Sequence, residues 1–431
     1  MKAYFIVTII CFAVYPTTVT HGKERISNNN KDVQVSMSLV REYLELNEAK
    51  KENEVINWIE EIGYSPKELK IHLKDSFPFP EKETGIYRKL VSFDNKKGEY
   101  IVYIPKGYDP KKTWPLIMSL HGVGESGLAY IRLWLSYSKH DNKYIFICPY
   151  YASGYWWEED ANNLIINALR RACIDYNVDT NRVYLTGFSS RAHGVWYFSI
   201  RHPDLLAGIV TISGECPIPD QISNLMNVPV YIIHGIKDSV IPVAAARDAK
   251  DRLEALGYEY RYEELPNLKH RYPISRNNAI LEWLDKKQRN PRPRKVKYKN
   301  SKPNPQRIYW SKIEKAVNIA GPPDVKIDKK LFDYHTGLKL EKSGFKPDYA
   351  ILNTEINDNK INVTCENIEK FKLFLDGELV DMGESVVVMV NGKQMFSGKL
   401  KQDIDVLFQT LEVMYDRNSL YTGSVEVEIK R

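Results

Sequence analysis

Hydrophobic and polar positions along the chain follow two different periods, and the changes between them mark out its organisation. Short runs of apolar, β-branched and aromatic residues predict eight strands, and apolar residues at helical spacing predict helices between the later ones. The strands are expected at 87–93, 99–104, 115–120, 144–149, 182–186, 208–213, 228–234 and 258–265, and the main helices at 162–176, 192–202, 244–256 and 277–286. An Asn-Lys-Lys-Gly turn should join the first two strands as a hairpin. Strands that alternate with helices indicate an α/β fold with a mostly parallel eight-stranded sheet and helices on both faces.

The residues before this region combine a leader-like start with helical spacing. Residues 36–46 and 54–62 predict two short helices, so 23–84 is expected to form an N-terminal helical arm. One lysine, an apolar run from Ala3 to Tyr15 and a stretch of small residues are typical of a secretory signal peptide over 1–22. An uncleaved anchor is the alternative, although the run is short for a membrane span. We therefore expect a secreted or periplasmic protein without stable membrane insertion.

Strand-like periods return after residue 307 and predict a second, β-rich domain. The expected strands are 308–313, 349–356, 360–364, 370–375, 385–390, 393–397 and 424–429, with one helix at 403–415. We assign 85–288 to the α/β domain and 289–431 to a basic, proline-rich junction followed by a sandwich-like domain. The stretch Lys286 to Arg307 holds ten Lys/Arg, four prolines and no acidic residue. We interpret it as a solvated linker and edge strand, with binding of an acidic polymer as the alternative.

Composition narrows the possible functions. The chain has 431 residues with 61 Lys+Arg against 55 Asp+Glu, and the basic stretch accounts for the whole surplus. A nucleic-acid-binding protein is therefore not expected. Beyond the leader lie four widely spaced cysteines, Cys148, Cys173, Cys216 and Cys365, without the spacing of a zinc site. A disulfide among the first three and buried free thiols both remain open. No metal and no cofactor is expected.

Three segments that follow predicted strands carry residues suited to acyl transfer. His121-Gly-Val-Gly-Glu-Ser-Gly127 supplies glycines for a sharp turn that presents backbone N–H groups, as an oxyanion hole requires. Ser189 follows Gly187-Phe188 between a strand and a helix, which is the context of a nucleophile elbow. Asp238 and His270 lie in loops after later strands, and the order Ser, Asp, His is that of an α/β-hydrolase triad.

The region 87–286 resembles the α/β-hydrolase superfamily, and is most similar to its secreted carbohydrate-esterase and polyhydroxybutyrate-depolymerase-like branch, which includes feruloyl and acetylxylan esterases. Four segments carry the resemblance: Leu-His-Gly-x-Gly-Glu, Tyr-Leu-Thr-Gly-x-Ser with Gly-x-Trp, Arg-His-Pro-Asp, and His-Gly-x-Lys-Asp with Ile-Pro. The C-terminal β-domain looks like one fused to such hydrolases in some bacterial proteins. The chain departs from the pattern at Arg191-Ala192, where relatives carry Gly-Gly because helix and strand approach closely. This departure puts activity in question.

The candidate site residues take the roles of a serine hydrolase. Ser189 is the nucleophile, His270 the general base and Asp238 its orienting partner. Backbone N–H groups of Val123 and Ser190 are the candidate oxyanion donors, and Ser190 is also a rival nucleophile.

Other residues near these motifs have a weaker assignment. Trp156 and Trp157 are candidates for lining the substrate site, with packing of their own loop as an equal alternative. Cys216, Glu125 and His193 are expected to be structural.

We therefore expect a secreted serine carboxylic-ester hydrolase that acts through an acyl-enzyme on esters of polysaccharide or similar bulky substrates. One alternative is a prolyl-oligopeptidase-like serine peptidase, which shares fold and triad. The other is an inactive hydrolase fold that binds carbohydrate. The oligomeric state is not indicated by the sequence.

Overall fold

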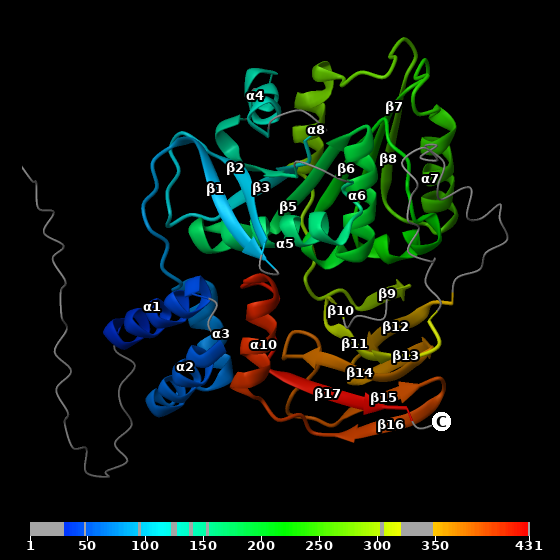
Figure 1. Cartoon of the computed structure of the whole chain (residues 1–431). Helices are drawn as coiled ribbons and strands as arrows, with labels where there is room; N and C mark the ends of the chain where they lie inside the picture. Colours follow the sequence, from blue (N-terminus) through cyan, green and yellow to red (C-terminus); the bar gives the residue numbers. More distant parts are fainter. Residues whose placement is uncertain are drawn as a thin grey trace, which may run out of the picture.

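Eight strands between Gly85 and Leu265 form one sheet in the computed structural model (Figure 1), which describes residues 30–46, 49–93, 96–121, 127–137, 141–151, 155–301, 306–319 and 348–429. The strands are β1 (Gly85–Phe93), β2 (Lys96–Ile104), β3 (Trp114–Ser119), β4 (Ile145–Tyr150), β5 (Val178–Phe188), β6 (Gly208–Ile212), β7 (Val230–Gly235) and β8 (Tyr260–Leu265), in the order β1-β2-β4-β3-β5-β6-β7-β8. Strand β2 runs antiparallel to both β1 and β4, and the other neighbours are parallel. The predicted hairpin and mostly parallel sheet are confirmed. The predicted leader, residues 1–22, lies outside the described residues.

Helices cover both faces of this sheet because its parallel strands are apolar on both sides. Leu116 and Met118 of β3 belong to one buried cluster, and Ile117 between them belongs to another. The first cluster includes residues of α5 (Glu159–Asp175), α6 (Ser190–Arg201) and α7 (Val243–Ala255), and the second those of α4 (Gly127–Tyr137) and α8 (Asn277–Leu284). Helix α4 was not predicted, because its sequence is mostly apolar and only Arg132 and Ser136 mark its exposed side as polar.

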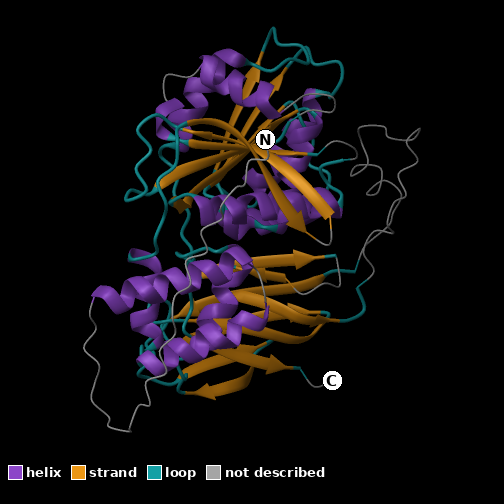
Figure 2. Ribbon diagram, turned by 60° about the vertical axis from the view of Figure 1, so that its left-hand side comes forward, coloured by secondary structure: helices purple, strands orange, loops and turns teal. Residues whose placement is uncertain are grey.

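The C-terminal strands form two sheets that pack face to face (Figure 2). One contains β10 (Gln306–Ile308), β11 (Ser311–Ala316), β14 (Ile368–Leu375) and β17 (Gly423–Glu428), and the other contains β16 (Lys393–Gly398), β15 (Val386–Val390), β13 (Lys360–Glu366), β12 (Ala350–Asn357) and β9 (Lys295–Asn300). The hairpins at Asp358 and Asn391-Gly392 have positive φ at these residues, as tight turns require. The structure therefore confirms a sandwich, with β9 as the expected edge strand.

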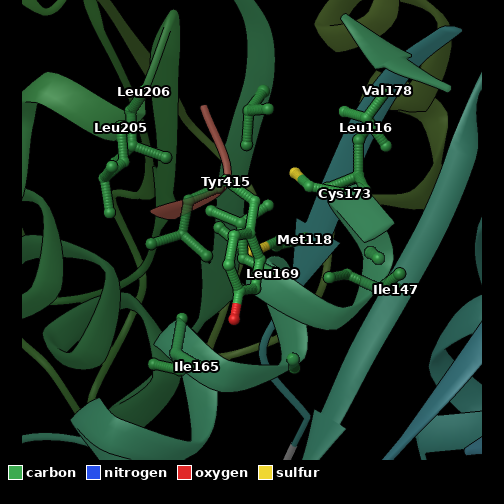
Figure 3. Packing of buried hydrophobic residues seen from close by; sticks show 14 of the residues in the cluster. Leu116, Met118, Ile147, Ile165, Leu169, Cys173, Val178, Leu205, Leu206 and Tyr415 are labelled. Carbon is green, nitrogen blue, oxygen red and sulfur yellow. The ribbon is translucent and has the colours of Figure 1, made fainter. Parts of the chain in front are cut away.

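The N-terminal helices pack against a helix from the other end of the chain. Helices α1 (Asn30–Leu46) and α2 (Ala49–Ile62) correspond to the two predicted helices, and α3 (Pro66–Asp75) is an addition that begins at a Ser65 capping box. They lie beside α10 (Ile404–Met414) in Figure 1. Tyr415, which ends α10, lies among sheet and α5 residues of the main hydrophobic cluster (Figure 3). Its hydroxyl donates to the Leu44 carbonyl, so the end of α10 joins the core of the α/β domain to the N-terminal helices.

Arginines of the basic junction are buried between the two domains, and the expectation of a solvated linker is wrong for them. Arg289 is 3% exposed and pairs with Asp416 at 2.6 Å, and Arg292 pairs with Asp376 at 2.7 Å. Arg289 also donates to the Asp204 carbonyl, and Thr180 donates to Asp416. Desolvated guanidinium groups need such partners. These arginines are therefore occupied within the molecule.

Cys148, Cys173, Cys216 and Cys365 are buried and free in the structure. Burial raises the pKa of the Cys173, Cys216 and Cys365 thiols, as is expected for inert thiols. Among the described residues, no helix is long and apolar enough to cross a membrane.

Candidate active site

Ser189 stands at a sharp turn between β5 and α6. Its backbone has φ 62° and ψ −131°, a left-handed conformation that costs a residue with a side chain about 1–3 kcal/mol. The turn is held by two hydrogen bonds, from the Ser189 N–H to the Ile212 carbonyl and from the Ala192 N–H to the Ser189 carbonyl, both 2.9 Å. This geometry is that of the predicted nucleophile elbow.

Two glycines make room for the unusual residues Arg191 and Ala192. A Cβ atom on Gly187 would lie 2.7 Å from the Arg191 carbonyl carbon and oxygen, so Gly187 lets the helix approach the strand. A Cβ atom on Gly214, after β6, would lie 2.2 Å from the Ala192 Cβ. The methyl group of the fully buried Ala192 therefore occupies space that Gly214 leaves empty. The Arg191 side chain is half-buried.

The structure brings Ser189, His270 and Asp238 together in one chain of hydrogen bonds. Ser189 Oγ lies 2.7 Å from His270 Nε2, and His270 Nδ1 lies 2.8 Å from Asp238 Oδ2. Ser189 is 9% exposed, Asp238 is buried, and the His270 side chain is 18% exposed. The hydrogen bond of His270 goes to Ser189 rather than to its rival Ser190.

Asp238 is held as a carboxylate. Its Oδ1 accepts N–H groups of Val240 and Ile241, each at 2.9 Å. Burial alone would raise the Asp238 pKa, but the hydrogen bonds from His270 and these two amides outweigh it, and the pKa lies below its ordinary value. A charged Asp238 can fix the tautomer of His270 and stabilise its imidazolium form.

A close approach of two loops allows His270 to reach Asp238. A Cβ atom on Gly235, at the end of β7, would lie 2.3 Å from the Leu268 carbonyl oxygen, so a side chain at that position would separate the loops. The Lys237 N–H donates to the same carbonyl at 3.1 Å. The Phe188 ring packs 5.0 Å from the His270 ring and covers one side of it.

The two candidate oxyanion donors differ in what the structure describes. Ser190 is the first residue of α6, where backbone N–H groups lack a partner within the helix. Val123 lies outside the described residues, as does Glu125. The segment that leads to Val123 is fixed at His121, whose Nε2 accepts from the Tyr151 N–H at 3.0 Å.

The two tryptophans have different environments. Trp156 is 5% exposed, donates from Nε1 to the His121 carbonyl at 3.0 Å and fills the space beside Gly194. Trp157 is half-buried and stacks on Tyr155, with ring centroids 4.6 Å apart. The packing alternative therefore fits Trp156, and Trp157 remains the candidate for lining the substrate site.

Other residues near the site are buried. His193 lies 5.9 Å from the Trp157 ring, and burial lowers its pKa to about 3, so it is neutral. Cys216 is 4% exposed. Within the described ranges, no three His, Cys, Asp or Glu side chains gather as a metal site would need.

One buried histidine beside Asp238 was not singled out from the sequence. His234 Nε2 lies 3.7 Å from Asp238 Oδ2. Its signal was present, because it opens the His-Gly-x-Lys-Asp segment at a strand end, four residues before Asp238.

One protein family matches part of the chain. Residues 159–288 match the Phospholipase/Carboxylesterase family. The matched segment contains Ser189, Asp238 and His270. It supports an α/β-hydrolase of the esterase type.

Two curated relatives share part of the chain. Acyl-protein thioesterase 1 of Kluyveromyces lactis is 25% identical over 130 residues, which cover 28% of this chain and 57% of that protein. Acyl-protein thioesterase 1 of Saccharomyces cerevisiae is 33% identical over 97 residues, which cover 20% of this chain and 43% of that protein. The chain thus spans about half the length of the curated relatives it matches.

Two solved structures that are similar to part of the chain are esterases. A thermostable esterase has a TM-score of 0.43 and 23% identity, covering 47% of this chain and 63% of that chain. A ferulic acid esterase of Anaeromyces mucronatus, solved with ferulic acid, has a TM-score of 0.40 and 15% identity, covering 50% of this chain and 94% of that chain.

Proposed function

We propose that the protein is a serine carboxylic-ester hydrolase that acts through an acyl-enzyme on Ser189. The observation that carries the proposal is the chain of hydrogen bonds from Ser189 Oγ to His270 and from His270 to the Asp238 carboxylate. A nucleophile, a base within hydrogen-bond reach and a group that orients the base are the parts that nucleophilic catalysis requires.

The geometry gives each residue a step. Ser189 Oγ attacks the ester carbonyl carbon while His270 Nε2 takes the hydroxyl proton, and the same proton then passes to the leaving alcohol oxygen. A water molecule next attacks the acyl-enzyme with His270 again as base, which releases the acid and restores Ser189. The N–H groups of Ser190 and Val123 are the proposed donors to the tetrahedral oxyanion.

The β-sandwich is proposed to stabilise the hydrolase rather than to line its site. Thr180, near the start of β5, contacts Asp416 of the C-terminal region, whereas Ser189 follows the end of the same strand. At about 3.3 Å per residue, about 30 Å separates these two positions. A substrate carried on polysaccharide, and export by the N-terminal leader, remain part of the proposal. Mass spectrometry of the N-terminus of protein recovered from the culture medium would test the export.

A fluorophosphonate probe tests the nucleophile. We expect peptide mass spectrometry to locate the adduct on Ser189, with labelling lost in Ser189→Ala and retained in the matched control Ser190→Ala. No adduct on folded protein, or an adduct on Ser190, would refute the proposed mechanism. Labelling that is absent while glycans still bind would instead support the non-catalytic alternative.

A substrate panel then distinguishes the acyl-transfer classes. The panel contains acetylated xylan, a feruloylated arabinoxylan oligosaccharide, p-nitrophenyl esters, an acylated cysteine peptide and a prolyl peptide amide. We expect turnover of oxygen esters, with the bulky saccharide esters preferred. Faster turnover of the thioester would move the function towards that of the curated relatives, and turnover of the amide alone would favour the peptidase.

A further inference from the structure

His234 occupies a buried position between the triad aspartate and the loop that holds it. It is 0% exposed at the end of β7. Its Nε2 lies 2.9 Å from the Ile241 carbonyl oxygen, which can only accept, so the ring hydrogen is on Nε2. Its Nδ1 is buried and has no hydrogen-bond partner in the part of the chain that the structure describes. A buried polar atom without a partner destabilises the fold, and the hydrogen bond from the other nitrogen of this ring to Ile241 offsets part of that cost.

The backbone of Ile241 is held on both sides of its Cα atom. Its carbonyl accepts from His234, and its N–H donates to Asp238 Oδ1 at 2.9 Å. The second N–H on Oδ1 comes from Val240, in the same turn. The turn that grips Oδ1 is therefore anchored to the strand by one imidazole. With Oδ1 gripped, Oδ2 faces His270 Nδ1 at 2.8 Å.

On this geometry, we propose that His234 is a positioning residue of the triad, which fixes the Asp238 carboxylate towards His270 by holding the Ile241 carbonyl. This inference rests on the proposed function, because the step that it serves is the proton transfer by His270. His234 does not touch the substrate or the reacting atoms. It acts through Ile241 and Asp238.

The role requires a neutral ring. Burial lowers the His234 pKa, although the hydrogen bond to Ile241 and the carboxylates of Asp238 and Glu264 act in the opposite direction, and the nearby His270 adds to the lowering. His193, buried on α6, also lies near enough to interact electrostatically with His234 and is itself neutral. A charged His234 would place a second cation 3.7 Å from Asp238 Oδ2 and compete with the imidazolium of His270.

Three variants separate positioning from general packing. His234→Leu removes the donor, and His234→Gln places an amide N–H near the position of Nε2. We expect kcat to fall about 10²-fold in His234→Leu with little change in KM, because a small displacement of a catalytic group has that effect. His234→Gln should recover most of the loss. In the Asp238→Asn background, His234→Leu should cost nothing further, since the interaction that it supports is already gone.

The pH profile provides a readout that packing alone does not move. A misplaced Asp238 stabilises the imidazolium form of His270 less, so the acid limb of kcat/KM should move to lower pH in His234→Leu. Unchanged kcat and an unchanged acid limb in a folded variant would overturn the proposal. Losses that add fully to those of Asp238→Asn would also overturn it, because they would show an effect that does not pass through Asp238.

Nuclear magnetic resonance separates this inference from the proposed function. The midpoint of the His270 imidazole titration can be compared in wild type and His234→Leu, with His234→Gln as the variant that keeps a donor, even if no substrate is turned over. If His234→Leu does not fold, the comparison uses His234→Gln and His234→Asn, of which only the first keeps a donor at the Nε2 position. An identical midpoint in both would refute the positioning role. An inactive wild-type protein would refute the proposed function but not the positioning role of His234.

Discussion

Two sets of segments flank the parallel strands of the α/β sheet: the entering segments lead into the amino ends of the strands, and the leaving segments follow their carboxyl ends. The polar residues of these two sets have different roles. The entering segments contact the C-terminal domain: Thr180 binds Asp416, the Pro203 carbonyl accepts from Tyr309, and Asn224 pairs with the Lys299 backbone. The leaving segments carry Ser189, Asp238 and His270. The first network contains the buried ion pair of Arg289 and Asp416, and the second ends in the neutral hydroxyl of Ser189, a residue that is 9% exposed. The contacts that stabilise the domain junction thus lie at the amino ends of the strands, and the candidate catalytic residues lie at their carboxyl ends.

The largest expected effect is on catalysis and comes from a change in the leaving segments. Asp238→Asn should lower kcat by about 10⁴-fold, because the amide would favour the wrong tautomer of His270. The melting temperature should change little, since Asn keeps the oxygen that accepts from Val240 and Ile241. Steady-state kinetics and calorimetry of the same preparation check this. A fall in activity under tenfold would remove Asp238 from the proposed triad.

The next largest effect is on the free energy of unfolding and comes from a change at the junction with the entering segments. Asp416→Asn leaves the buried Arg289 without its charge partner, and breaking such a pair costs about 3–5 kcal/mol of unfolding free energy. The matched control is Asp251→Asn, at an aspartate whose side chain is 66% exposed and paired with Lys250. This control should change stability by about 0.5 kcal/mol or less. Urea unfolding followed by fluorescence measures both, and kcat of the folded fraction should be unchanged.

Acid should reproduce part of this loss. The ion pair with Arg289 outweighs desolvation and holds the Asp416 pKa below its ordinary value. The stabilisation is therefore complete above about pH 4, the ordinary aspartate range, and is lost as the pH falls below it. Asp416→Asn should show a smaller loss of unfolding free energy between pH 5 and pH 2 than wild type. Equal dependence of the unfolding free energy on pH in both proteins would contradict the lowered pKa of Asp416.

A smaller effect is expected at the elbow. Gly214→Ala would place a methyl group 2.2 Å from the Ala192 Cβ and 3.2 Å from the Ser189 carbonyl oxygen. Overpacking of this kind costs about 1–3 kcal/mol and should lower activity by displacing Ser189. The double variant Ala192→Gly/Gly214→Ala should recover both. Loss without recovery would show that Gly214 has another role.

The smallest effect is expected at the aromatic loop. Trp157→Ala should raise KM for esters with aromatic or saccharide groups by about tenfold and leave kcat nearly unchanged. Trp156→Ala is the matched comparison, and it should lower kcat instead because Trp156 holds the His121 carbonyl. Equal effects on small acetate esters and bulky esters would exclude Trp157 from the substrate site.

The sequence was more informative about the candidate site in the leaving segments than about the contacts of the entering segments with the C-terminal domain. Ser189, Asp238 and His270 each sit in a local pattern of a strand, a turn and a polar residue, and their order in the chain suggested that they meet. Arg289 was interpreted as solvated because its partner Asp416 lies 127 residues later, and no local pattern indicates such a pair. The sequence also did not predict that Trp156 is buried while Trp157 is half-buried, because Trp156 packs into space left by the absence of a side chain at Gly194.

The attachment of the sandwich to the entering segments has an evolutionary consequence. Loops that leave the strands can lengthen, shorten or change composition without disturbing Arg289, Asp416 or the packing of Tyr415. Substrate preference can therefore diverge between descendants of this protein while the domain junction is inherited intact. Substitutions at the junction have no such freedom, because each must be matched by another far along the chain.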